Sequence, residues 1–361
     1  MGLEFKLSDR ELPVSPVFVH FLAQVLEKLP FDRQVWAEQR SETLSSNVID
    51  LNRVADAAAL VMGSAFGRER LARAYTLLFA LLTGDLGPLS ELQSRFHFVT
   101  CIGIPRTGGS YLTAELYRAL GIMPEHVPSG LAHDSFPEVG PFQLQPGVNS
   151  WVVTLKTMAE YLTMVEIFFG DLQSHRGKIV VPKKLTKAVY AGGLFHRVLG
   201  QGTAHVLTVR HPVASCVSTY EKSGGLPADG RFTVRSNIEE WCHRDLQHIG
   251  CSVAQLNRMD YFDAYLRYWE HYYLSLALTG LSASRHLQVV AFGKAALQAA
   301  AQDHHDLYGS GLHASEFHTS DKARRLHPEW LERAQPAVDR VEAAWKSVGI
   351  AFPTEEIALC W

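Results

Sequence analysis

The segment GIPRTGGS, Gly103 to Ser110, contains the residue types of an anion-binding loop. Its spacing follows the phosphate-loop pattern G-x-x-x-x-G-K-[ST], except that Gly109 stands where the pattern requires lysine. Arg106 lies inside the segment, and its guanidinium can donate two parallel hydrogen bonds to one anionic group. The sequence therefore predicts an oxyanion site whose cation differs from that of the common phosphate loop.

The segments on either side of this loop favour the same chemistry. Residues 97–105 are a short apolar run typical of a strand, and residues 110–121 have the pattern of a helix that ends at Gly121. A glycine-rich turn between a strand and a helix points free backbone N–H groups and the positive end of the helix dipole toward an anion. Gly108 and Gly109 would let the backbone approach that anion closely.

A phosphoryl-transferring enzyme with such a loop also needs a carboxylate that holds magnesium, usually at the end of another apolar strand. Three further segments are predicted strands, at residues 178–182, 205–209 and 286–292, and none is followed by Asp or Glu. A sulfuryl group carries one negative charge during transfer, whereas a phosphoryl group carries two. Loop amides and one fixed cation can therefore suffice for sulfuryl transfer, and we expect no metal site.

The phrase PRTGGSYL resembles the phosphosulfate-binding loop of sulfotransferases that use 3′-phosphoadenosine 5′-phosphosulfate (PAPS). That family has Lys or Arg, then Ser or Thr, then Gly at the start of the loop, and Arg106, Thr107 and Gly108 match. The next two positions are usually Thr or Ser. Ser110 matches, whereas Gly109 departs and removes one hydroxyl that could bond the sulfate or phosphate.

A second motif, RHPVASCVS, resembles the 3′-phosphate site of the same family, which has Arg at a strand end, Pro two residues later and Ser eight residues after the Arg. Arg210, Pro212 and Ser218 match. Pro212 can begin a helix, and Ser218 would then face the nucleotide that Arg210 holds. The resemblance also places Tyr111 where some members have an aromatic residue beside the adenine; a helix core residue is the alternative interpretation.

Further catalytic roles follow from the resemblance. Lys183, at the end of the predicted strand 178–182, is a candidate cation near the bridging oxygen, with a solvent-facing lysine as the alternative. A hydroxyl acceptor needs a general base. Glu125 lies where some relatives carry a catalytic Glu and is the first candidate, followed by His133 and His126.

Two later segments are less informative. Residues 317–330 include a basic loop, and since a late loop covers the nucleotide in relatives, Lys322, Arg324 and Arg325 are candidate contacts. Residues 302–313 contain three His and two Asp but lack the spacing of a metal-binding helix such as H-E-x-x-H, so we predict a solvated loop there.

The order of the predicted elements defines the fold class. Apolar strands separated by helices indicate an α/β protein with a parallel sheet covered on both faces, and the resemblance implies a three-layer α/β/α P-loop fold. Residues 1–95 are predicted to be an added N-terminal helical region for packing or for homo-oligomerisation, and residues 96–361 the sulfotransferase-like domain. Tyrosines recur at helical spacing over residues 261–280, which predicts core packing, with part of the stripe able to wall an acceptor pocket.

Composition excludes several classes of partner. The 361 residues are 47% hydrophobic with a formal net charge of −3, so a large core is expected and nucleic acid is not. Five cysteines without a C-x-x-C pair predict a reduced, cytoplasmic protein without a disulfide framework. No uncharged apolar run reaches the length of a membrane span, and the first residues lack the apolar core of a signal peptide.

These features together predict a PAPS-dependent sulfotransferase that uses no metal. Its acceptor would be the hydroxyl of a carbohydrate, a lipid, a small molecule or a protein tyrosine. Two alternatives stay open. One is a P-loop nucleotide kinase, which would need ATP and magnesium. The other is a catalytically inert nucleotide or anion sensor on the same fold.

Overall fold

The computed structural model describes residues 14–27, 29, 32–33, 51–134, 148–281, 284, 286–309, 311–319 and 326–359. Contacts divide the chain into two compact units, one formed by residues 1–89 and 135–171 and the other by residues 90–134 and 172–361. The first unit ends close to the predicted boundary at residue 95. It also takes in a segment that lies, in the sequence, between two strands of the second unit.

The first unit consists of helices in its described part. They are α1 (Pro16–Leu26), α3 (Leu51–Gly63), α4 (Ala65–Thr83) and α8 (Val148–Phe168). Arg73 of α4 forms two hydrogen bonds with the carboxylate of Glu166 in α8, Nε–Oε2 at 3.0 Å and Nη2–Oε1 at 2.7 Å. The backbone N–H of Ser15, just before α1, donates to Glu160 Oε1 of α8 at 2.9 Å. α8 therefore connects the N-terminal helices to one another.

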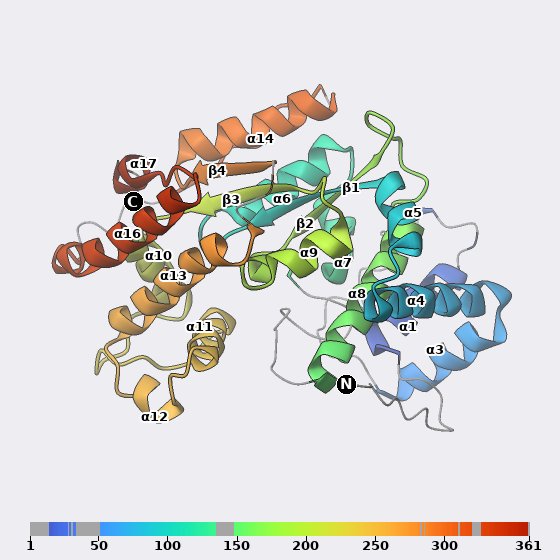
Figure 1. The fold of residues 1–361 in the computed structure, drawn as a ribbon, viewed down its shortest axis with the longest axis horizontal. Coiled ribbons are helices and arrows are strands. Elements are labelled where there is room, and N and C mark those ends of the chain that lie inside the picture. The colour runs from blue at the N-terminus through green and yellow to red at the C-terminus, as the bar shows by residue number, and fades with distance from the viewer. Residues whose placement is uncertain are drawn as a thin grey trace. The chain divides into compact units, whose positions relative to one another are not determined.

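The second unit is built on a four-stranded parallel sheet in the order β2-β1-β3-β4 (Figure 1). The strands are β1 (Phe96–Ile102), β2 (Ile179–Lys184), β3 (Ala204–Val209) and β4 (Leu287–Ala291). All four coincide with predicted strands to within a few residues. The α/β class and the parallel sheet are thereby confirmed.

Helices join these strands and follow the last of them. In chain order, with 3-10 helices marked η, they are α5 (Gly87–Arg95), α6 (Gly109–Ala119), η1 (Pro124–His126), α7 (Ser129–Ala132), η2 (Thr186–Tyr190), α9 (Gly192–Leu199), α10 (Pro212–Lys222), α11 (Asn237–His248), α12 (Val253–Leu256), α13 (Tyr261–Leu278), α14 (Lys294–Tyr308), α16 (Glu329–Ser347) and α17 (Thr354–Leu359).

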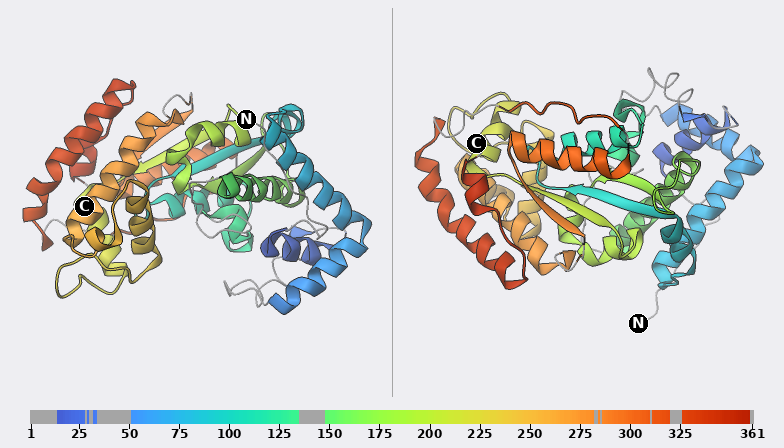
Figure 2. Two further views of the ribbon diagram at one scale, coloured as in Figure 1. Left: turned by 60° about the horizontal axis from the view of Figure 1, so that its bottom comes forward. Right: turned by 90° about the horizontal axis from the view of Figure 1, so that it is seen from above.

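One face of the sheet is covered by α6 and α14 (Figure 2). Alternate residues of the strands, such as Val99, Val206 and Val290, pack there against Leu112 of α6 and Leu297 of α14. Burial of such aliphatic side chains stabilises the fold by about 1.5–3 kcal/mol each. Helices also lie over the other face of the sheet, which is consistent with the predicted three layers (Figure 2).

Three buried side chains of α13 bond the backbone at the carboxyl ends of the strands. The Tyr272 hydroxyl donates to the Thr186 carbonyl at 2.6 Å and accepts from the Gly103 N–H at 3.1 Å. The Tyr273 hydroxyl donates to the Thr208 carbonyl at 2.9 Å, and Trp269 Nε1 donates to the Arg210 carbonyl at 2.9 Å. The tyrosine stripe is therefore core, as predicted, and its polar tips hold the loops that follow the strands.

One sequence prediction of local structure was wrong. The solvated loop expected at residues 302–313 begins instead with the last two turns of α14, in which His304 and His305 are buried. The C-terminal helix α16 runs through Pro336.

Two further observations bear on the expected cellular setting. In the described part of the chain, no helix is both long and apolar enough for a membrane crossing. Cys101, Cys216, Cys242 and Cys251 are buried free thiols, and Cys360 lies outside the described residues.

The hydrogen bonds of Tyr272 can be tested against a neighbouring tyrosine. Tyr272→Phe should lower the free energy of unfolding by about 1–3 kcal/mol, because it leaves a buried N–H and a buried carbonyl without their partner. Tyr268→Phe is the matched control, since the buried Tyr268 hydroxyl has no hydrogen-bond partner. Its removal should leave stability unchanged or raise it. Equal losses for the two variants in urea unfolding would contradict this role of Tyr272.

Candidate functional site

The strand order creates a crevice at the carboxyl end of the sheet. From β1 the chain continues to β2 on one side, and from β3 it continues to β4 on the other side. The loops after β1 and β3 therefore diverge, and ligands of open α/β sheets bind where loops diverge in this way. Both sequence motifs follow these two strands, Gly103–Ser110 after β1 and Arg210–Ser218 after β3.

A cavity of about 280 Å³ lies at this crevice and is lined by both motifs. The first motif contributes Arg106 and residues 108–111, and the second contributes Arg210 and Ser218. Lys184, at the end of β2, also lines it, and no acidic residue occurs among its described lining residues. Cationic side chains and the N-terminus of α6 make this cavity an environment for an anion.

Arg210 is the buried charge of this cavity. Only 6% of its surface is exposed, its Nη1 donates to the Arg106 carbonyl at 3.1 Å, and its guanidinium lies 3.9 Å from the centre of the Phe292 ring. Burial, together with the positive charge of Arg106, lowers the pKa of Arg210 to about 10, so it stays protonated at neutral pH. No described carboxylate forms an ion pair with it, and its buried Nε has no partner. A buried guanidinium with this environment calls for a bound anion.

Arg106 physically links the two motifs. Its side chain is exposed, and its Nε donates to the Ser218 hydroxyl of α10 at 3.0 Å. Its φ of +73° lies in the left-handed region, which costs a residue with a Cβ on the order of 1–3 kcal/mol. The bond from Arg210 to the Arg106 carbonyl and the bond from Arg106 to Ser218 hold this conformation.

Gly108 and Gly109 differ in what they require of the loop. Gly108 has a φ of +94°, and a Cβ there would lie 2.7 Å from Leu297 Cδ1, so both conformation and space require glycine. A Cβ at Gly109 would make ordinary contacts, 3.8 Å from Lys184 Cε and 3.9 Å from Thr208 Oγ1. The Lys184 side chain, which comes from β2, therefore lies beside position 109.

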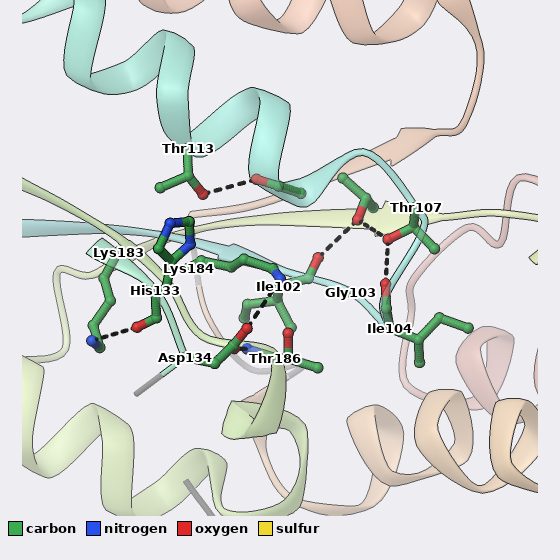
Figure 3. Close-up of polar contacts among 12 residues, drawn as sticks. Ile102, Gly103, Ile104, Thr107, Thr113, His133, Asp134, Lys183, Lys184 and Thr186 are labelled. Carbon is green, nitrogen blue, oxygen red and sulfur yellow. Dashed lines mark hydrogen bonds and ion pairs between the residues drawn. The ribbon is translucent and has the colours of Figure 1, made fainter. Parts of the chain in front are cut away.

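Lys184 was missed by sequence reasoning, which selected Lys183 instead. The two side chains leave β2 on opposite faces (Figure 3). Lys184 shares the face of Val180, under α6, and forms an ion pair with Asp134 at 3.0 Å. Strand alternation could have identified it once the face covered by the loop helix was known.

Lys183 is buried on the other face and does not line the cavity. Its Nζ donates to the His133 carbonyl at 2.8 Å (Figure 3) and to the Gly130 carbonyl at 3.1 Å. Burial lowers the pKa of Lys183 to about 7, although Asp134 opposes the shift. Its contacts fix the backbone after α7.

Thr107, Ser110 and Tyr111 have three different environments. The buried Thr107 hydroxyl donates to the Ile104 carbonyl and bonds the Thr208 hydroxyl, both at 2.7 Å, so it holds the loop and does not line the cavity. Ser110 is an exposed lining residue in the first turn of α6. Tyr111 is half-buried and also lines the cavity, which leaves its ring available to a ligand.

A late loop, residues 311–319, reaches the same cavity. The Tyr111 hydroxyl donates to the Ser315 carbonyl at 2.7 Å, and the Tyr111 and Phe317 ring centres are 4.9 Å apart. The buried Glu115 carboxylate accepts from the Ser315 N–H at 3.1 Å and lies 3.0 Å from His305 Nε2. Phe317, with the two residues after it, lines the cavity. Lys322, Arg324 and Arg325 lie outside the described residues.

The candidate bases are placed differently. The ring of His133 lies beside Lys184 (Figure 3), and partial burial together with the Lys184 ammonium lowers its pKa below the ordinary value of 6.5. Glu125 is exposed on η1 and His126 is half-buried beside it, and neither lines the cavity. His133 does not line the cavity either, and it differs from the other two candidates in lying beside the lining residue Lys184.

No protein-family model, no curated protein and no solved structure matches the chain. Within the described ranges, no group of three or more His, Cys, Asp or Glu is arranged to hold a metal ion.

The different roles of the two loop glycines give a matched pair of variants. Gly108→Ala should lower the free energy of unfolding by about 1–3 kcal/mol, because it combines a left-handed φ with a clash against Leu297. Gly109→Ala should cost nothing or stabilise by about 0.4–1 kcal/mol, because its conformation and space accept a Cβ. Denaturant unfolding measures both. A loss at Gly109 as large as that at Gly108 would overturn this description of the loop.

Proposed function

We propose that the chain is a PAPS-dependent sulfotransferase with a P-loop α/β/α fold. The observation that carries this proposal is the buried, protonated Arg210, which shares one cavity with Arg106 and Lys184 where no described lining residue is acidic. The cavity thus has cations for two anionic groups. Arg210 and Ser218 would hold the 3′-phosphate, and Arg106, Lys184 and the amides of α6 the 5′-phosphosulfate.

The remaining lining residues also suit a nucleotide. Tyr111, Phe292 and Phe317 offer aromatic surface next to the cations, and a base with a π-face can stack on such rings. The cavity volume, about 280 Å³, is just below the ~300–1,000 Å³ typical of ligand pockets, so part of a bound nucleotide would extend beyond the enclosed space.

During transfer, the acceptor oxygen would form a bond to sulfur while the bond from sulfur to the phosphate oxygen breaks. The electron pair of the broken bond stays on the phosphate. Arg106 and the α6 amides are fixed donors for this growing charge, and fixed donors stabilise a transition state without reorganising. The acceptor proton would pass to the imidazole of His133, which its low pKa keeps neutral.

The kinase alternative is supported less well, because the site offers few oxygen ligands for magnesium. Magnesium in a phosphoryl-transfer site is held by carboxylate and hydroxyl oxygens. Asp134 lies beside the lining residue Lys184, and its two oxygens already bond Lys184 and the Thr186 N–H. An anion sensor on the same fold would use the same cations without the base, so only turnover separates it from the enzyme.

Nucleotide binding and transfer together test the proposal. The product 3′-phosphoadenosine 5′-phosphate should raise the melting temperature, whereas ATP with magnesium should not, because a ligand stabilises only the native state that binds it. Arg210→Ala should weaken this binding by ~2–3 kcal/mol, roughly 30- to 150-fold. Arg106→Ala should mainly lower kcat, since its contact strengthens in the transition state.

Three outcomes decide between the functions. Stabilisation by ATP with magnesium alone would replace the sulfotransferase with the kinase. Binding of the 3′-phosphorylated nucleotide without sulfate transfer to any carbohydrate, lipid, phenol or tyrosine acceptor would favour the sensor. If Arg210→Ala bound the nucleotide as tightly as the unaltered chain, the second motif would have only a structural role.

The base assignment has its own test in the pH dependence. A base acts when it is neutral, so kcat/KM should be level near neutral pH and fall as the pH drops through a pKa below 6.5. His133→Gln should lower kcat by ~10²- to 10⁴-fold and remove this acidic limb. Glu125→Gln is the control and should leave the profile unchanged. If Glu125→Gln removed the acidic limb and His133→Gln did not, Glu125 would be the general base.

A further inference from the structure

A second cavity, of about 560 Å³, lies at the amino end of the same sheet. Residues at or before the beginnings of the four strands line it, together with the last turns of α14 and the turn at residues 175–178. β1 runs from this end to the phosphate-loop end over seven residues, which is about 20 Å at strand geometry. The cavity is therefore separate from the site described above.

Histidines from five different segments line this cavity: His97, His175, His205, His286 and His304. His304 is only 6% exposed, and its Nε2 is buried without a hydrogen-bond partner. The Nε2 of His175 is also buried without a partner. Buried polar atoms are almost always hydrogen-bonded, so these two Nε2 atoms are unusual; because water cannot reach them, a bound molecule could bond them only after their rings turn.

The charge of the cavity is positive. Arg176 and Lys178 line it, while Asp303 is its one described acidic lining residue. Burial lowers the pKa of His205 to about 3 and that of His304 to about 4, so both imidazoles are neutral at neutral pH, and the ring nitrogens of His205 already bond Thr100 and His196. The attraction for an anion therefore comes from the two permanent cations.

Apolar surface completes the lining. Val99, Val180 and Val206 of the sheet, with Leu307 and Tyr308 of α14, contribute it. The volume falls within the ~300–1,000 Å³ typical of small-molecule sites, which combine an apolar lining with a few polar groups.

We propose that this cavity is a second ligand site, which binds a small organic anion with an apolar body. The apolar strand and helix residues hold the body, and Arg176 and Lys178 bind its anionic group. The site is independent of the proposed sulfate transfer.

Isothermal titration calorimetry with 2-naphthoate tests the site on the full chain. The neutral analogue 2-naphthol is the matched control for charge, and we expect it to bind at least tenfold more weakly. Arg176→Asn should weaken 2-naphthoate binding about tenfold or more, the scale of a charge-assisted contact. Asn is the chosen replacement because Arg176 has a φ of +50°, which Asn tolerates. His304→Phe should abolish binding by filling the cavity.

The Arg210→Ala variant tests whether 2-naphthoate binds in this cavity or at the phosphate loop. Arg210→Ala should leave 2-naphthoate affinity unchanged while it weakens nucleotide binding. The proposal is wrong if 2-naphthoate gives no saturable binding, if Arg176→Asn binds it like the unaltered chain, or if Arg210→Ala removes it. Because Arg176 is exposed, its variant keeps the test valid even if His304→Phe fails to fold.

Discussion

Hydrogen bonds from α13 to the ends of the strands are the constraint on which the site depends. Tyr272, Tyr273 and Trp269 bond backbone groups next to β1, β2 and β3, inside a core where unpaired polar groups are costly. Residues that bind ligands gain precision when the elements beneath them are rigid. One helix therefore sets the relative positions of both anion-binding motifs.

The buried guanidinium of Arg210 suits the proposed anion site but lowers the stability of the folded protein. A buried guanidinium loses its hydrogen bonds to water. In their place Arg210 has one hydrogen bond to the Arg106 carbonyl and a contact with the face of the Phe292 ring. Proteins commonly carry such unfavourable features at their functional sites and compensate for them elsewhere. The large aliphatic cluster between the sheet and its covering helices supplies the compensation here.

Much of this architecture could be predicted from sequence because its signals are local. Each strand is a short apolar run, and the two motifs follow β1 and β3 directly. Residues whose role depends on a distant partner could not be assigned. Lys184 and Lys183 differ only in the face of the sheet to which they point, and His305 is buried by Glu115, far away in the sequence. The two motifs and the cations that they bring together, Arg106 and Arg210, support the proposed binding of PAPS.

The connection from β1 to β2 contains α8, which belongs to the helical unit. Because α8 belongs to the helical unit but is encoded between two strands of the sheet unit, neither unit is a continuous stretch of chain. Removing the first 89 residues would strip α8 of the helices that cover Met158, Tyr161 and Leu162, turning buried surface into an aggregation-prone face. The helical unit is therefore complete only when the chain has passed through the first strand of the sheet and on to α8.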